Sequence, residues 1–247
     1  GCQSSRIPVS VIGNYPFPVR YVKPVATGNA SGSSWDNASA DLQAMINISE
    51  VNYEVWVAEG TYTVPYYETF IMKNGVRIYG GFPAEGSPTM ESRNITGNPT
   101  ILTSMGNTII KNNNNNLTST SLLDGFIIQG GYGYLGGGIC NINSSPTIAN
   151  CIFKNNNASN WGGGMYNEGN SNATVINCLF YNNTASGGGA AFDYNGASPV
   201  YINTTFANNH STVNGGAIHT YQSAKSTLRN CIVWGNTATS DGDQVMS

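Results

Sequence analysis

The side chains that could carry out acid–base chemistry are few in this chain and widely spaced. Hydrolysis of a glycosidic bond needs two carboxylates close to the bond, and the candidates are Asp124, Asp193, Asp241 and Asp243. Elimination instead needs a basic side chain, often beside Ca²⁺ held by clustered carboxylates, and the candidate bases are Lys154, Lys225 and Arg229. Because these residues are scattered along the chain, they predict no single catalytic centre, and we name no catalytic residue.

Metal binding has one weak candidate, the turn Asp241-Gly242-Asp243, whose carboxylates could hold Ca²⁺. A solvated turn explains the same residues. Cys151, Cys178 and Cys231 share one position of a repeat, and Thr204 replaces them in another copy. Such a column fits neither a disulfide framework nor the close cysteine pairs that zinc prefers, so we predict small buried thiols. The sequence therefore predicts no metal site and no cofactor, with Ca²⁺ left open.

A short motif that occurs four times organises the second half of the chain. The copies are Asn-Cys-Ile-Phe-Lys-Asn-Asn at 150–156, Asn-Cys-Leu-Phe-Tyr-Asn-Asn at 177–183, Asn-Thr-Thr-Phe-Ala-Asn-Asn at 203–209 and Asn-Cys-Ile-Val-Trp-Gly-Asn at 230–236. Their first residues are 27, 26 and 27 positions apart, and glycine runs separate the copies. A fixed period of this length is typical of a solenoid whose repeats contact only their neighbours.

The period of two along a β-strand predicts three columns of inward-facing residues. The columns are Ile148-Val175-Tyr201-Leu228, Cys151-Cys178-Thr204-Cys231 and Phe153-Phe180-Phe206-Val233. We expect the asparagines beside them at sharp corners, because asparagine tolerates the left-handed backbone, and stacked copies can hydrogen-bond along the coil axis. The two expected ladders are Asn150, Asn177, Asn203, Asn230 and Asn156, Asn183, Asn209, Asn236.

The expected fold is all-β: a right-handed parallel β-helix with about 26 residues and three strands per coil, and one N-terminal capping helix. We predict an extended lead-in over 1–20 and a single β-helix over 21–247, with the cap helix over about 35–48 and regular repeats over 122–247. Ser34 or Asp36 can cap the helix, which would cover the open first coil. Five further strands are expected at 54–57, 69–72, 76–79, 100–102 and 108–110.

The last repeat stops part-way through a coil, at Ser247. We therefore expect this end to be covered by further coils of a parent chain, by a partner, or by self-association. At the other end, Gly1-Cys2 would suit a lipid-modified cysteine, although a processing or cloning remnant explains it equally well.

The same alternation predicts an exposed aromatic row on the outside of the coils. Cys140, Tyr166, Phe192 and His219 share one outward column, and Ile142, Glu168, Tyr194 and Tyr221 share the next. The candidate ligand-binding residues are Tyr166, Phe192, Tyr194, His219 and Tyr221. Flat aromatic rows can stack on sugar rings or contact a protein. Cross-strand stacking that only stabilises the sheet is the alternative.

The repeat resembles that of a known family. Phe153-x-x-Asn156, Phe180-x-x-Asn183 and Phe206-x-x-Asn209 alternate with Gly-Gly-Ala-Ala at 188–191 and Gly-Gly-Ala-Ile at 215–218. These motifs resemble the Phe-x-x-Asn and Gly-Gly-Ala-Ile repeats of the chlamydial polymorphic outer-membrane proteins. The N-terminal half, through its residues 21–23, 32–35, 55–62 and 78–82, resembles the opening of large secreted β-helix proteins of environmental bacteria. The resemblance implies a surface-exposed β-helix with an adhesive role. Pectin-lyase-like enzymes share the fold, but a fold alone assigns no function.

Composition narrows the partners. Charged residues make up 9% of the chain and the net charge is −3, so no basic patch for nucleic acid is expected. No run of about 18 apolar residues occurs, so no transmembrane segment is expected. We predict an extracellular or bacterial cell-surface module, non-enzymatic, adhesive or fibre-forming, that contacts a polysaccharide or a surface protein. The alternative is a polysaccharide lyase or glycoside hydrolase of the pectin-lyase-like fold.

Overall fold

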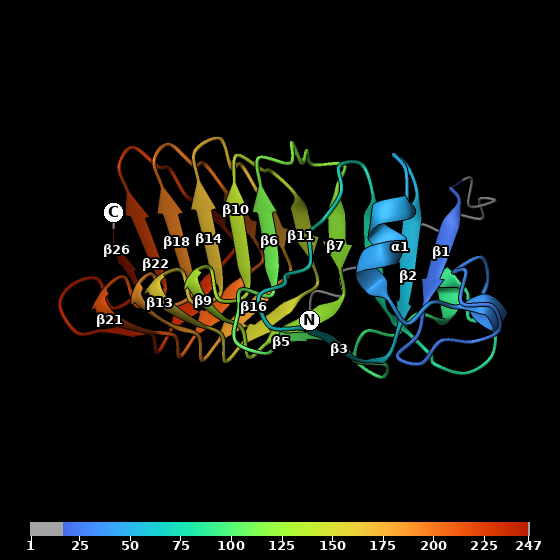
Figure 1. The fold of residues 1–247 in the computed structure, drawn as a ribbon. Helices are drawn as coiled ribbons and strands as arrows, with labels where there is room; N and C mark the ends of the chain where they lie inside the picture. Colours follow the sequence, from blue (N-terminus) through green and yellow to red (C-terminus); the bar gives the residue numbers. More distant parts are fainter. Residues whose placement is uncertain (1–16, 247) are drawn as a thin grey trace, which may run out of the picture.

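The computed structural model describes residues 17–246, which form a right-handed parallel β-solenoid of about seven turns of about 27 residues (Figure 1). The expected all-β right-handed β-helix is thus confirmed. Cys2 and nearly all of the expected lead-in lie outside the described residues. The first strand begins at Val19, two residues before the expected start of the β-helix.

Four parallel sheets run along the solenoid. Sheet A contains β1 (Val19–Val22), β2 (Glu54–Ala58), β4 (Arg77–Phe82), β7 (Leu122–Asp124), β11 (Thr147–Ala149), β15 (Thr174–Ile176), β19 (Val200–Ile202) and β23 (Thr227–Arg229). Sheet B contains β3 (Gly60–Val64), β5 (Thr100–Ser104), β8 (Phe126–Gln129), β12 (Ile152–Lys154), β16 (Leu179–Tyr181), β20 (Thr205–Ala207) and β24 (Ile232–Trp234).

The other two sheets complete each coil. Sheet C contains β6 (Ile110–Asn113), β10 (Ile139–Ile142), β14 (Met165–Glu168), β18 (Ala191–Tyr194), β22 (Ile218–Tyr221) and β26 (Val245–Met246). Sheet D contains β9 (Tyr132–Leu135), β13 (Asn157–Trp161), β17 (Thr184–Gly187), β21 (His210–Asn214) and β25 (Thr237–Ala238). A regular coil passes through sheets A, B, D and C in that order.

Each regular coil therefore has four strands, one more than expected, because the repeat bends more often than its asparagine columns indicate. Asn150 and Asn155 both adopt left-handed backbone, with φ of 52° and 54°, on either side of β12. Gly162 bends the chain again, at φ 70°, between β13 and β14. The second bend falls on Asn155 rather than on the predicted Asn156, whose side chain is buried.

The N-terminal helix is shorter than expected. A 3-10 turn covers Trp35–Asn37, and α1 covers only Leu42–Ile48. The N-cap is Asp41 instead of Ser34 or Asp36, and its carboxylate accepts a hydrogen bond from the Ala44 N–H at 2.8 Å. A second 3-10 turn covers Met90–Ser92.

Helix α1 takes the place of a strand beside sheet C in the first coils (Figure 1). Its Gln43 side chain accepts from the Ile71 N–H at 2.8 Å and donates to the Ile71 carbonyl at 3.1 Å, as a neighbouring strand would. On the other side, Phe70 forms a single parallel bridge with Ile110. The segment 69–72 consequently forms no extended strand, contrary to the sequence-based expectation.

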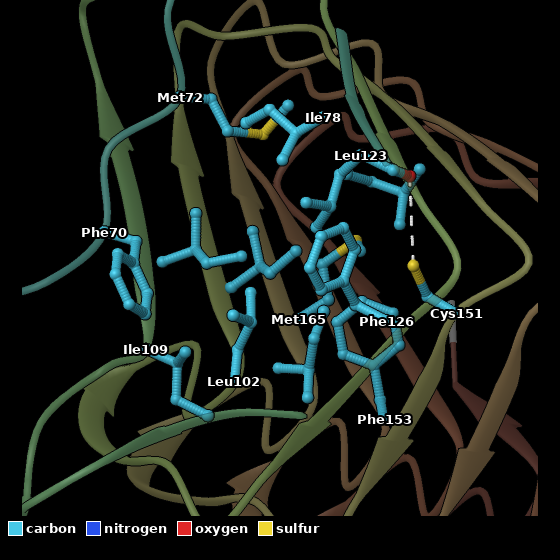
Figure 2. Packing of buried hydrophobic residues seen from close by; sticks show 14 of the residues in the cluster. Phe70, Met72, Ile78, Leu102, Ile109, Leu123, Phe126, Cys151, Phe153 and Met165 are labelled. Atoms are coloured by element: carbon cyan, nitrogen blue, oxygen red, sulfur yellow. Dashed lines mark hydrogen bonds between the residues drawn. The ribbon is translucent and has the colours of Figure 1, made fainter. Parts of the chain in front are cut away.

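The core fills the centre of the solenoid with stacked apolar columns. Figure 2 shows its first part, where Phe126 and Phe153 lie among the aliphatic side chains of neighbouring coils. Further along, the Phe153 and Phe180 rings stack at 4.4 Å and the Phe180 and Phe206 rings at 5.0 Å. Cys151 and Cys178 are buried free thiols, whereas Cys231 is only partly buried. The Cys151 thiol donates to the Leu123 carbonyl at 3.8 Å (Figure 2).

Amide ladders follow the corners. On the outer ladder, Asn177 donates to Asn150 at 3.3 Å and Asn203 donates to Asn177 at 3.2 Å. Asn150 in turn donates to the Asp124 carboxylate at 2.9 Å. On the inner ladder the side chains of Asn156, Asn183, Asn209 and Asn236 are bonded in series at 2.8–3.0 Å, each amide donating to the next coil.

A third ladder, which the sequence analysis did not identify, runs inside the solenoid along sheet C. Asn112 donates to Asn141, Asn141 to Asn167, and Asn167 to Asp193, at 2.8–2.9 Å. All four residues are fully buried. Sheet C thus contributes a polar column as well as an apolar one to the interior.

Candidate ligand-binding groove

The predicted aromatic row lies on the outer side of sheet C, but much of it is covered. Strand pairing places Cys140, Tyr166, Phe192 and His219 side by side across β10, β14, β18 and β22. Tyr166 and Phe192 are each 1% exposed, so the prediction that they are exposed is wrong. Tyr194 and His219 are partly exposed, and Tyr221 is 51% exposed.

Trp161, the last residue of β13, provides the cover. Its ring stacks on Phe192 at 4.9 Å with an interplanar angle of 9°, and on Tyr166 at 6.2 Å. Cys140, Tyr166 and Phe192 thereby form a small second core outside the solenoid, and Leu135 packs on it from the preceding coil. Burial raises the pKa of the Cys140 thiol to about 12, so it is protonated at neutral pH.

The cover ends abruptly at the next coil. Leu135, Trp161, Gly187 and Asn214 occupy one register position of sheet D. At Gly187 the covering side chain is absent, and a hollow of about 730 Å³ opens there, which we call the aromatic groove. Trp161, Phe192, His219 and Tyr221 line it, with Val213, Met246 and several polar residues.

His219 gives the aromatic groove a polar atom without a protein partner. Its Nδ1 atom is buried and has no hydrogen-bond partner within residues 17–246. Burial lowers the pKa of the imidazole, so the ring is neutral at pH 7 and Nδ1 can donate or accept according to its tautomer. The ring packs edge-on against Phe192 at 4.7 Å. A groove with flat aromatic walls and a few polar groups is typical of small-ligand sites.

The carboxylates considered for catalysis are separated by the fold. Asp124, the last residue of β7 in sheet A, is paired with Arg93 and accepts a hydrogen bond from the Asn150 amide. Asp193 is buried inside the solenoid, where Asn167, Tyr201 and Ser226 donate to it at 2.8, 3.2 and 2.5 Å. Burial raises the Asp193 pKa to about 6.

The turn considered for Ca²⁺ lies near the end of the described chain. The Asp243 carboxylate accepts from the Ala238 N–H at 2.7 Å, a bond that shapes the turn itself. Within residues 17–246, no cluster of three or more His, Cys, Asp or Glu side chains is arranged to hold a metal ion.

Sequence reasoning identified the outward columns but not Trp161 and Gly187, which decide what is exposed. A signal for them exists. Each register residue immediately precedes a glycine at φ 60–70°, namely Gly136, Gly162, Gly188 and Gly215. The size of the residue before each such glycine therefore predicts whether the outward aromatic side chains of sheet C are covered in that coil.

Comparison with known proteins gives one family match. Residues 203–221 match the Chlamydia polymorphic membrane protein repeat. No curated protein sequence and no solved structure matches the chain. Within residues 17–246, no helix is both long and apolar enough to span a membrane. The matched segment runs from the corner asparagine Asn203 through β20, β21 and β22, which is most of one turn of the solenoid. The chain is thus a parallel β-helix repeat protein, and its stretch at 203–221 is similar to the Chlamydia polymorphic membrane protein repeat.

Proposed function

We propose that this protein is a non-enzymatic binding module of the bacterial surface, and that its aromatic groove holds sugar rings of a polysaccharide. One observation carries the proposal: at Gly187 the coil lacks the side chain that covers its neighbours, and a groove walled by aromatic rings results. Pyranose rings present apolar C–H faces and polar edges. Trp161 and Tyr221 offer flat surfaces for the former, and polar side chains of the lining, such as Asn160 and Asn214, offer partners for hydroxyls.

The groove supports a ligand better than it supports sheet stability alone. Side chains that only stabilise the sheet would be expected to stay covered, as Tyr166 and Phe192 are beneath Trp161. Tyr221 instead stacks on Tyr194 at 6.1 Å and leaves half of its surface exposed. Exposed aromatic area of this kind is typical of binding surfaces.

The experiment fills the groove with the side chain that the preceding coil carries. In Gly187→Trp, the new Cβ would lie 3.0 Å from Phe192 Cε2 and 3.3 Å from His219 Nδ1, so these rings must move slightly. We expect the variant to fold and to lose retention on an immobilised polysaccharide panel that retains the parent protein. Circular dichroism and thermal unfolding check the fold.

Tyr221→Ala tests the same groove without touching the core. Loss of one stacking ring is expected to weaken binding about threefold to tenfold. The matched control is Tyr181→Ala, because Tyr181 is 38% exposed but lies on sheet B, on another face. Equal retention of the parent and both groove variants would refute the proposal.

The same panel separates binding from catalysis. New reducing or unsaturated sugar ends after incubation would refute the non-enzymatic assignment and favour the lyase or hydrolase alternative. An adhesive role would follow if the retained polysaccharide also competes with attachment of cells or surfaces that display it.

A further inference from the structure

A second hollow, which we call the tyrosine hollow, lies at the other end of the covered aromatic column. It has a volume of about 400 Å³, and its lining includes Lys111, Tyr67, Tyr132 and Tyr134. The three tyrosines are 94%, 56% and 69% exposed, respectively. Three exposed aromatic rings and one cation thus line the same hollow.

The backbone holds these rings outward. Tyr132 and Tyr134 alternate with the buried Gly133 along β9, so both side chains project from the same side of this strand. Tyr67 has a left-handed backbone, with φ 66°. A bulky residue adopts this conformation at a cost in free energy, and such strain is concentrated at functional sites.

Lys111 supplies a positive charge that the protein does not neutralise. Within residues 17–246 the ion pairs are Arg77 with Glu54 and Arg93 with Asp124, so the Lys111 ammonium has no carboxylate partner there. Strand pairing places Lys111 next to Cys140 in the outward column of sheet C. The charge therefore lies at the start of the column that continues through Cys140, Tyr166 and Phe192 to His219.

The two hollows lie on one face of the solenoid. Ser159 lines the tyrosine hollow and its neighbour Asn160 lines the aromatic groove. Lys111 and His219 lie four strands apart on sheet C, which corresponds to about 19 Å at about 4.8 Å per strand. Figure 1 shows β6, β10, β14, β18 and β22 side by side along this face. A short extended oligosaccharide is long enough to reach from one hollow to the other.

We infer that the tyrosine hollow binds a carboxylate-bearing sugar unit, with the ring on the tyrosines and the carboxylate at Lys111. The inference deepens the proposed function, because both hollows would then hold one acidic polysaccharide. The inference predicts that an acidic sugar chain binds more tightly than the neutral chain of the same linkage. Binding in the aromatic groove alone does not predict this difference.

The test compares a cello-oligosaccharide with its C6-oxidised form, in which glucuronate replaces glucose. Binding is measured by isothermal titration calorimetry at low and high salt. We expect the parent protein to prefer the oxidised ligand by about threefold to fivefold, as an exposed charge pair allows. High salt should reduce this preference and leave the neutral ligand unchanged.

Lys111→Gln should abolish the preference without changing the affinity for the neutral ligand. Lys154→Gln is the control, because it removes the same charge from β12 in sheet B. Tyr134→Ala should weaken the binding of the oxidised ligand. Gly187→Trp should weaken the binding of both ligands. If it weakens the binding of neither while Lys111→Gln still abolishes the preference, the proposal for the aromatic groove is refuted and the inference for the tyrosine hollow is retained. Equal affinities for the two ligands, equal effects of Lys111→Gln and Lys154→Gln, or no binding of either ligand would overturn the inference.

Discussion

Asp193→Asn should stabilise this protein at neutral pH and change the pH dependence of its stability. Asp193 is the last member of the buried ladder that Asn112, Asn141 and Asn167 begin. Its carboxylate is fully buried, and the groups that donate to it are all neutral. An asparagine would keep an oxygen for these donors, and its amide could donate to the Ser226 hydroxyl.

The magnitude follows from the pKa. Burial raises the Asp193 pKa from 3.8 to about 6, so between these values the folded state binds more protons than the unfolded state. The contribution to stability is therefore fully present below about pH 3.8 and is lost as the pH rises through about 6. A difference of about two pH units corresponds to about 3 kcal/mol of unfolding free energy. Asp193→Asn should recover about that amount at pH 8, or about 6–12 °C in Tm.

Thermal unfolding at pH 4, 6 and 8, followed by circular dichroism, measures both effects. Glu54 also has a raised pKa because of burial, so the Asp193→Asn variant keeps some pH dependence of Tm from this group. The control is Asp124→Asn, which removes the carboxylate that faces Arg93 and should destabilise the protein. A lower Tm of Asp193→Asn at pH 8, or an unchanged slope between pH 4 and 6, would refute the reasoning.

Three further experiments test the packing of the coils. Asn183→Ala should lower the free energy of unfolding by about 3–5 kcal/mol, because four buried hydrogen bonds lose their partner. Asn177 has a left-handed backbone and lies at an exposed corner, so Asn177→Gly should lower it by less than about 1 kcal/mol. Urea unfolding compares the two variants. Phe180→Ala should cost about 3–5 kcal/mol in the same assay, because Phe180 stacks between two phenylalanines, and a loss below about 1 kcal/mol would contradict this packing. A thiol reagent should label Cys231 before Cys178 at pH 8, because Cys178 is buried and burial raises its pKa. Peptide mapping gives the order of labelling, and the reverse order would contradict the burial of Cys178.

Much of the interior follows from the sequence because a strand has a period of two. Ile148, Val175 and Tyr201 are fully buried, as their column predicts, and Asn150 has the left-handed backbone expected of a corner. The same rule places Asn141 inside as well, next but one to Ile139. Asparagine is ordinarily exposed, so the residue type alone does not predict this burial. The stacked copies satisfy each other's amide groups, which removes the free-energy penalty of burying them.

The covered part of the aromatic row could not be predicted in the same way. Alternation along β14 indicates that Tyr166 points away from the core, but it does not indicate what lies over it. The cover comes from Trp161, in a different sheet, where the register shifts between Ala158 and Trp161. Such a register shift changes which residues of neighbouring sheets contact each other. The period of two along a strand does not predict it.

The amide ladders make the order of the coils directional. An asparagine side chain can both donate and accept, so it passes a hydrogen bond from coil to coil, whereas a carboxylate can only accept. The outer ladder ends on Asp124 and the ladder inside sheet C ends on Asp193, both at 2.8–2.9 Å. Copying or deleting a whole coil between such ends preserves the chain of bonds, but an Asn-to-Asp change within a ladder divides it in two. Each of these two ladders thus has one acidic end, Asp124 on the N-terminal side of the outer ladder and Asp193 on the C-terminal side of the sheet C ladder, and a duplicated coil keeps the bonds only if it is inserted on the asparagine side of that end.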